Sequence, residues 1–177
     1  MPRVFENVGI PKVPRSLFNL SHSKVFTCNL GKWYPTMAVD VVPGDIFDIS
    51  KNVVVRFQPL LAPVLHEVYL KEYTFFVPYR ILMDDDVYSG DAGKFEEMII
   101  GGTDGDTEIA IPAWNPSSTG VGSLWEAFGL PLSVNPTGFR PMDMLKRAYN
   151  MIWNEYCMDI DLDTALTIET AEDVQGS

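Results

Sequence analysis

The sequence predicts a mainly β domain with helical and long-loop insertions. Before Pro78 the chain is rich in β-branched and aromatic residues, whereas helical spacing of apolar residues appears only after Pro141. The 177 residues, 46% of them hydrophobic, are enough for about one domain with a single core. No apolar run approaches the roughly 18 residues that span a bilayer, so we expect no membrane insertion.

Residues 1–22 predict an extended, basic N-terminal arm. Pro2, Pro11 and Pro14 each lack a backbone donor, which excludes a helix or a central strand there. From residue 1 to 32 a single acid stands against five basic residues: Arg3, Lys12, Arg15, Lys24 and Lys32. These five side chains are candidate contacts to DNA phosphates, with simple surface solvation as the equal alternative.

The remainder of the chain is acidic. Thirteen basic residues against 24 acidic ones give a net charge of −11, and seven acids but no base follow Arg147. Because phosphate binding requires clustered Lys and Arg, the chain as a whole does not read as a nucleic-acid binder.

Four regions before Pro78 predict strands, because each is rich in β-branched and aromatic residues and is bounded by Gly, Pro or Asp. They are Ser23–Leu30, Trp33–Val42, Ile46–Phe57 and Val64–Val77. In the third region Val53, Val55 and Phe57 alternate with their neighbours, so one side of that strand is expected to face the core. Pro43 and Gly44 predict a tight turn between the second and third strands, with a positive φ at the glycine.

Residues 79–140 predict an insertion of loops and short helices. Ser123 and Glu126 have the spacing of a capping box, which predicts a brief helix to about Phe128. A longer helix is predicted from 141 to about 158, with Pro141 in its first turn. Five residues on one face of this helix are expected to face the core: Leu145, Ala148, Tyr149, Ile152 and Tyr156.

No pattern of residues predicts catalysis, so we expect no enzyme. His22 and His66 are the only histidines, neither lies in a nucleophile motif, and the spacings typical of zinc sites are absent. The acidic runs 84–86 and 104–106 offer oxygen ligands for Ca²⁺ but do not match an EF-hand loop. They are interpreted as solvated loop acids, and no cofactor is expected.

Four sequence elements, in order along the chain, resemble elements of the major capsid proteins of the microviruses, in particular the gokushovirus branch. They are Arg15–His22, Val42–Phe47, Phe75–Arg80 and Arg147–Tyr156. The candidate subunit-interface or family-motif residues within them are Phe18, Leu20, His22, Pro43, Gly44, Asp45, Phe76, Pro78, Arg80, Arg147, Tyr149, Asn150, Trp153, Asn154 and Glu155.

This resemblance implies an eight-stranded antiparallel viral jelly roll and a structural function. It implies a T=1 icosahedral shell of sixty copies that encloses a circular single-stranded DNA genome. The implied location is the virion, whose shell assembles in the bacterial host cytoplasm. Packaged DNA, a small basic DNA-binding viral protein and a host receptor are the implied partners. Family members are longer than this chain, so we expect residues 23–177 to be the N-terminal part of one jelly-roll domain.

A second hypothesis is a soluble β-sandwich that binds carbohydrate. Trp33, Tyr34 or Trp114 would then serve as stacking platforms for sugar rings. A sandwich hydrolase is a weaker alternative, because the sequence contains no paired-acid motif of the kind that glycoside hydrolysis needs.

Overall fold

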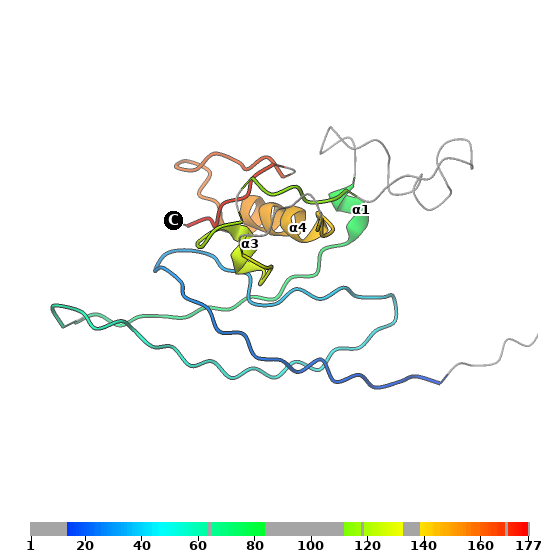
Figure 1. Cartoon of the computed structure of the whole chain (residues 1–177), viewed down its shortest axis with the longest axis horizontal. Helices are drawn as coiled ribbons and strands as arrows, with labels where there is room; N and C mark the ends of the chain where they lie inside the picture. Colours follow the sequence, from blue (N-terminus) through cyan, green and yellow to red (C-terminus); the bar gives the residue numbers. More distant parts are fainter. Residues whose placement is uncertain are drawn as a thin grey trace, which may run out of the picture.

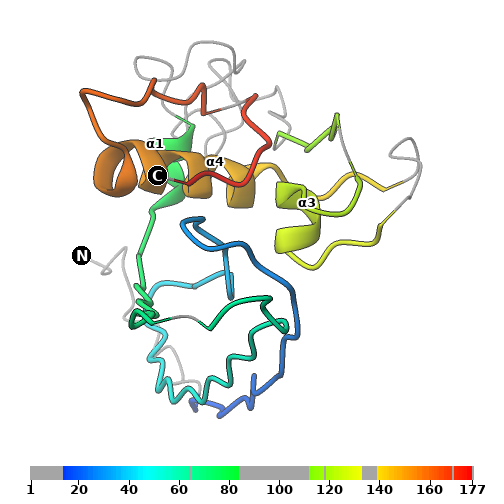
Figure 2. The same cartoon turned by 90° about the vertical axis from the view of Figure 1, so that its left-hand side faces the viewer.

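Helices gather on one side of the molecule and long extended chain on the other (Figure 1). The structure is a computed structural model and describes residues 14–63, 65–83, 112–117, 119–132, 139–168 and 170–176. We call the described residues from 14 to 78 the extended region and those from 79 to 176 the helical module. In two perpendicular views the extended region lies beneath the helical module (Figures 1 and 2).

Helix α3 (Leu124–Ala127) is the brief helix that the capping box predicts. The Ser123 hydroxyl accepts a hydrogen bond from the Glu126 amide, and the Glu126 carboxylate reaches back to the Gly122 amide. The helix ends at Ala127, and the positive φ of 79° at Gly129 allows the Gly129 and Leu130 amides to bond carbonyls of the helix. Both ends of α3 are therefore fixed by local sequence.

Helix α4 (Met144–Ile152) continues directly into a π-helical turn, η1 (Trp153–Cys157), within the range predicted for the long helix. Pro141 does not lie in the first turn, so that detail of the prediction is wrong. Its carbonyl instead accepts from the Trp114 amide at 2.8 Å, because residues 141–143 pair with residues 112–114 ahead of the helix.

The predicted apolar face of the long helix is also wrong in part. Tyr156 is 73% exposed, whereas the deeply buried side of α4 carries Met144, Arg147 and Asn150. The physical reason is that this side packs against main chain, whose carbonyl groups require polar partners when they are buried.

Two small cores hold the helical module together. Helix α1 (Tyr79–Leu82) packs against α4 through Leu82, Met83 and Met144. The other core surrounds two tryptophans, whose rings meet edge to face with centroids 5.2 Å apart. Its buried members are Trp114, Leu124, Trp125, Ala127 and Val174.

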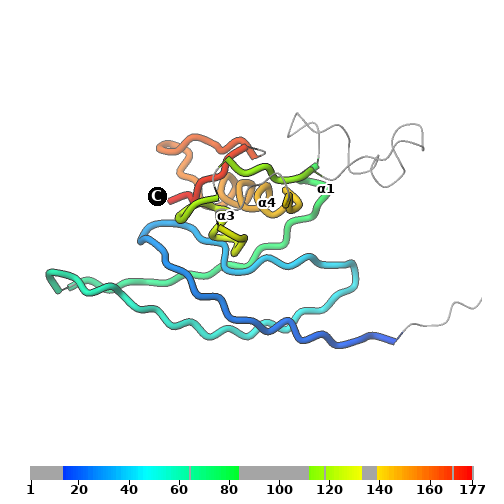
Figure 3. Tube along the Cα trace, viewed as in Figure 1, coloured from blue at the N-terminus to red at the C-terminus, as the bar shows by residue number. Residues whose placement is uncertain are grey.

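The four predicted strand regions run extended (Figure 3), yet no ladder of hydrogen bonds joins them within the described residues. Both faces of the third region are open: Val53 is 57% exposed and its neighbour Val54 is 87% exposed. The expectation that one side of this strand faces the core is not met here, because no second layer of the described residues covers it. The jelly roll itself stays a prediction.

The turn between the second and third regions is confirmed. Gly44 has φ of +96°, and the Asp45 amide donates to the Val42 carbonyl at 3.0 Å. The Asp45 carboxylate accepts from the Val42 amide at 3.0 Å, which closes the turn from the other side.

Candidate functional site

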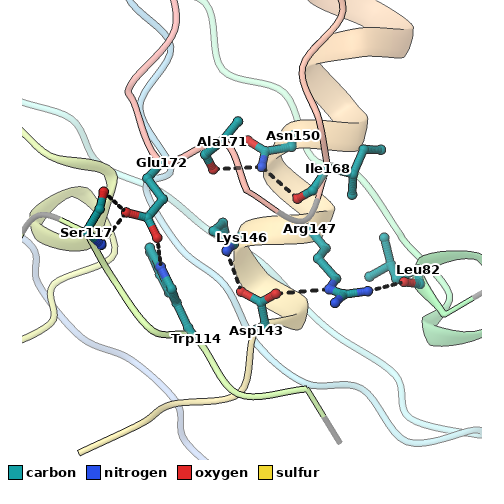
Figure 4. Close-up of polar contacts among 10 residues, drawn as sticks. All are labelled: Leu82, Trp114, Ser117, Asp143, Lys146, Arg147, Asn150, Ile168, Ala171 and Glu172. Carbon is teal, nitrogen blue, oxygen red and sulfur yellow. Dashed lines mark hydrogen bonds and ion pairs between the residues drawn. The ribbon is translucent and has the colours of Figure 1, made fainter. Parts of the chain in front are cut away.

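A row of polar side chains lies along the buried side of α4 (Figure 4). Asp143, Lys146, Arg147 and Asn150 are each at most 4% exposed. Burying charged and amide groups is unfavourable unless each group finds partners, so the contacts of this row decide whether the helical module is stable. We call these four residues the polar row.

Asp143 pairs with two cations one turn along the helix. Its carboxylate oxygens lie 3.0 Å from Lys146 Nζ and 3.0 Å from Arg147 Nε. Arg147 also donates through Nη1 to the Leu82 carbonyl at 3.2 Å, at the end of α1. The guanidinium therefore links α4 to α1 through a charge-assisted bond to a helix-end carbonyl.

Asn150 and Asn154 hold the segment that follows η1. The Asn150 amide group donates to the carbonyls of Ile168 and Ala171, each at 2.9 Å. Asn154 donates to the Leu166 carbonyl and accepts from the Leu166 amide, at 2.9 and 2.8 Å. Two asparagines thus bind irregular chain that has no secondary structure of its own to satisfy its backbone groups.

Glu172 ties the same segment to the loop before α3. Its carboxylate accepts from Trp114 Nε1 at 3.0 Å and from the amide and hydroxyl of Ser117. Burial alone would raise the pKa of Glu172, but the Ser117 and Trp114 hydrogen bonds and the nearby Lys146 charge outweigh it, and the pKa is lowered. Lys146 Nζ also lies 5.6 Å from the centre of the Trp114 ring.

A shallow polar hollow of about 300 Å³ opens beside these groups. It is lined by Ala113, Asn115, Asp143, Lys146, Thr170 and Glu172. Because the carboxylates and the ammonium in it already bond one another or their neighbours, we interpret it as part of the polar packing around α4.

Tyr149 connects α4 to the extended region. Its hydroxyl donates to the Trp33 carbonyl at 3.0 Å and accepts from the Gln175 amide at 2.9 Å. Burial raises the pKa of Tyr149 to about 12, so the hydroxyl keeps its proton throughout the physiological range.

The basic residues predicted to meet DNA are placed in three different ways. Arg3 and Lys12 lie outside the described residues, and Arg15 is exposed. Lys24 donates to the carbonyls of Pro35 and Ala127, and burial lowers its pKa. Lys32 donates to the Val174 carbonyl at 3.2 Å. Both described lysines therefore join the extended region to the helical module, and DNA contact by the five residues stays a prediction.

The other motif residues divide between surface and packing. Phe18, Leu20, Phe76 and Glu155 are exposed, and exposed His22 contacts its own chain at the Leu20 carbonyl. Pro78 precedes α1 as its N-cap, exposed Arg80 lies within α1, and Trp153 is buried at the start of η1. The turn of Pro43, Gly44 and Asp45 is described above.

Sequence reasoning missed Asp143, Lys146 and Glu172. A signal was present for the first two, because Asp143 precedes Lys146 and Arg147 by three and four residues, the spacing of helical ion pairs. Nothing local marks Glu172, since its partners lie 55 and 58 positions away.

Within the residues that the structure describes, no group of three or more His, Cys, Asp or Glu side chains is placed to hold a metal ion. The acidic runs 84–86 and 104–106 lie outside those residues. In the same described part of the chain, none of the helices has the length and apolar character that a bilayer crossing requires.

The carbohydrate-binding alternative gains no support. Trp114, one of its three proposed stacking platforms, is 1% exposed and packs between Trp125 and Phe128. Trp33 and Tyr34 are half-buried, and Tyr34 packs against the tryptophan core.

Comparison with known proteins identifies relatives along nearly the whole chain. "Capsid protein VP1" of Chlamydia phage 1 is 29% identical over 97% of this chain and 29% of its own length. The protein of the same name from Bdellovibrio phage phiMH2K is 28% identical over 86% of this chain and 28% of its own length. That of Spiroplasma virus 4 is 25% identical over 93% of this chain and 29% of its own length. No solved structure was found to match.

The chain thus spans about 29% of the length of the relatives it matches. The family model described as capsid protein (F protein) matches residues 7–177. The resemblance to microvirus capsid proteins that the sequence motifs indicated is confirmed by this match and by the three phage relatives. The chain belongs to the capsid protein (F protein) family of bacteriophages, a family of structural proteins of the virion.

Proposed function

We propose that this chain is part of a major capsid protein that self-assembles into a small icosahedral shell around a circular single-stranded DNA genome. The family match over residues 7–177 carries this proposal. The shell assembles in the bacterial host cytoplasm from sixty copies. The helical module stabilises the subunit, and its polar row does no chemistry on a substrate.

The extended region supports the proposal through its exposed apolar side chains. Val25, Val54 and Leu65 are each at least 87% exposed, and many other large apolar side chains between residues 17 and 76 are exposed as well. Apolar surface on this scale marks a region that becomes covered by protein. Extended backbone with free donors and acceptors is also the form that adds to a β-sheet. We therefore propose that these segments become strands of an eight-stranded jelly roll.

The basic arm is proposed to contact packaged DNA. Arg15 is exposed, so its charge can neutralise phosphate. Lys24 and Lys32 already donate to backbone carbonyls, so they contribute less to this contact than their charge suggests. A small basic viral protein would supply further positive charge, and the receptor would be a host surface molecule.

The experiment is to express the natural gene product that contains this chain and to measure particle mass by light scattering and shape by negative-stain imaging. Closed shells of uniform size are expected. A folded product that stays monomeric at every salt and calcium concentration would refute the proposal.

Two variants sharpen this test by placing one new charge at neighbouring exposed positions. Val55→Asp puts the charge on the apolar row that Val55 forms with Val53 and Phe57, and Asn52→Asp puts it on the opposite side of the same extended segment. We expect Val55→Asp to prevent shell formation while Asn52→Asp assembles normally. Equal assembly of both variants would show that Val55 does not lie in a covered surface.

A further inference from the structure

Three segments that are far apart in the sequence meet at one point beneath α4. They are residues 31–33 of the extended region, Tyr149 of α4, and residues 174–176 near the end of the chain. Figure 2 shows the last of these segments running alongside α4, with a blue loop of the extended region just below it. We call this meeting point the clasp.

The two outer segments of the clasp bind each other through main chain. The Trp33 amide donates to the Gln175 carbonyl at 2.8 Å, and Lys32 and Gly176 form an antiparallel β-bridge. The Lys32 ammonium adds a bond to the Val174 carbonyl at 3.2 Å. This single bridge is too short to be stable as an isolated β-pair.

Tyr149 supplies the third side of the clasp. The Tyr149 hydroxyl donates to the Trp33 carbonyl, and its oxygen accepts from the Gln175 amide. One hydroxyl thus satisfies one backbone group from each outer segment. If either segment detaches, the partly buried Tyr149 hydroxyl loses one of its two hydrogen bonds. This loss is unfavourable for the docking of the other segment too.

The close approach of the two segments depends on a glycine. A Cβ added at Gly176 would lie 2.5 Å from the Gly31 carbonyl oxygen and 2.8 Å from Lys32 Cγ. Since the first of these atoms belongs to the main chain, it cannot move away without shifting the turn. Gly31 itself has φ of +76°, so the turn is built from a residue that adopts this conformation without strain.

We propose that the clasp is a conformational latch, in which residues 31–33 and 174–176 dock on α4 as one cooperative unit and release together. The latch holds residues 31–33 of the extended region against the helical module. The proposal concerns the chain by itself and does not depend on shell assembly.

Residue-resolved amide hydrogen exchange on the 177-residue chain tests the latch with Tyr149→Phe. The Gln175 amide loses its acceptor directly in this variant, whereas the Trp33 amide keeps its own acceptor, the Gln175 carbonyl. Cooperative docking predicts that both amides exchange faster by roughly fivefold to thirtyfold. Faster exchange at Gln175 alone, or at neither amide, would overturn the proposal.

Tyr156→Phe is the matched control, because Tyr156 is 73% exposed on η1 and lies outside the clasp. Exchange at Trp33 and Gln175 should not change in it. The amides of α4 report on the overall fold in every variant. If they too exchange faster in Tyr149→Phe, that variant has lost more than the latch, and the result rests on a second variant.

Gly176→Ala is that second variant, since the three atoms nearest to the added Cβ belong to Gly31 and Lys32. We expect faster exchange at both Trp33 and Gln175 with α4 unchanged. Gln175→Ala serves as its control, because Gln175 joins the clasp through its main chain while its side chain donates to the Asp173 carbonyl, outside the clasp. Unchanged exchange at Trp33 in Gly176→Ala would overturn the latch.

Discussion

Replacing Asn150 by aspartate should destabilise the helical module strongly. Asn150 is fully buried, and its amide group donates to the Ile168 and Ala171 carbonyls at 2.9 Å each. In Asn150→Asp the size of the side chain is kept, but both donors are replaced by a group that only accepts when ionised. The Ile168 carbonyl, which is buried, and the Ala171 carbonyl, which is half-buried, then lose their partner and face a negative charge.

The magnitude follows from those two bonds. Each net hydrogen bond contributes about 0.5–1.5 kcal/mol, and each buried group left unpaired costs about 1–3 kcal/mol, so a loss of about 3 kcal/mol is expected. Urea unfolding followed by tryptophan fluorescence measures it. With a slope of about 1–3 kcal/mol per molar urea, the midpoint should fall by about 1–3 M.

Asn52→Asp makes the same chemical change at an exposed position and controls for the added charge. Its free energy of unfolding should stay within about 0.5 kcal/mol of that of the parent chain. If Asn150→Asp shifts the midpoint no more than Asn52→Asp does, Asn150 does not hold the segment from 168 to 171, and the polar row is not the support of this module.

Three further changes test other contacts. Asp143→Asn removes the charge that two buried cations share and should cost about 3 kcal/mol in urea unfolding; a loss below about 1 kcal/mol would contradict this pairing. The pKa of Glu172 is lowered in the folded chain, so its carboxylate contributes stability above the ordinary value of 4.5 that is lost as pH falls through the folded pKa. Glu172→Gln should therefore be less stable than the parent at pH 7, with the gap narrowing below pH 4.5; a gap independent of pH would be the contrary result. Lys51→Ala breaks the ion pair with Glu72 at 2.7 Å, but both side chains are about one-third exposed, so the change should stay within about 1 kcal/mol; a larger loss in unfolding would show that this pair is shielded from solvent.

Features that depend on neighbouring residues were predictable from the sequence. The capping box at Ser123 and Glu126 marks α3, and Pro43 with Gly44 marks the turn before Asp45, because each is closed by contacts within four residues. The motif from Arg147 to Tyr156 included Arg147, Tyr149 and Asn150 of α4 but not Lys146. Their roles were not predictable, because their partners lie on other segments.

Features that depend on distant residues were predicted poorly. The side of α4 that is buried follows from what packs against it, and the carbonyls of Ile168 and Ala171 meet Asn150 there. Apolar periodicity therefore missed this polar side, and of the face that it selected Tyr156 is exposed while Ala148 and Tyr149 pack against the cores. Lys24 and Lys32 read as free charges, yet their carbonyl partners lie 103 and 142 positions away. The strand regions have the composition of strands but lack a pairing partner within the described residues.

The central claim is that the exposed apolar residues of the extended region become covered when the capsid subunit is complete and assembled. Amide exchange at residues 53–57, compared between the 177-residue chain and the assembled particle, tests it most directly. These residues are exposed and join no ladder in the described structure, so we predict fast exchange in the chain and exchange slower by orders of magnitude in the particle. Equally fast exchange in both would contradict the account.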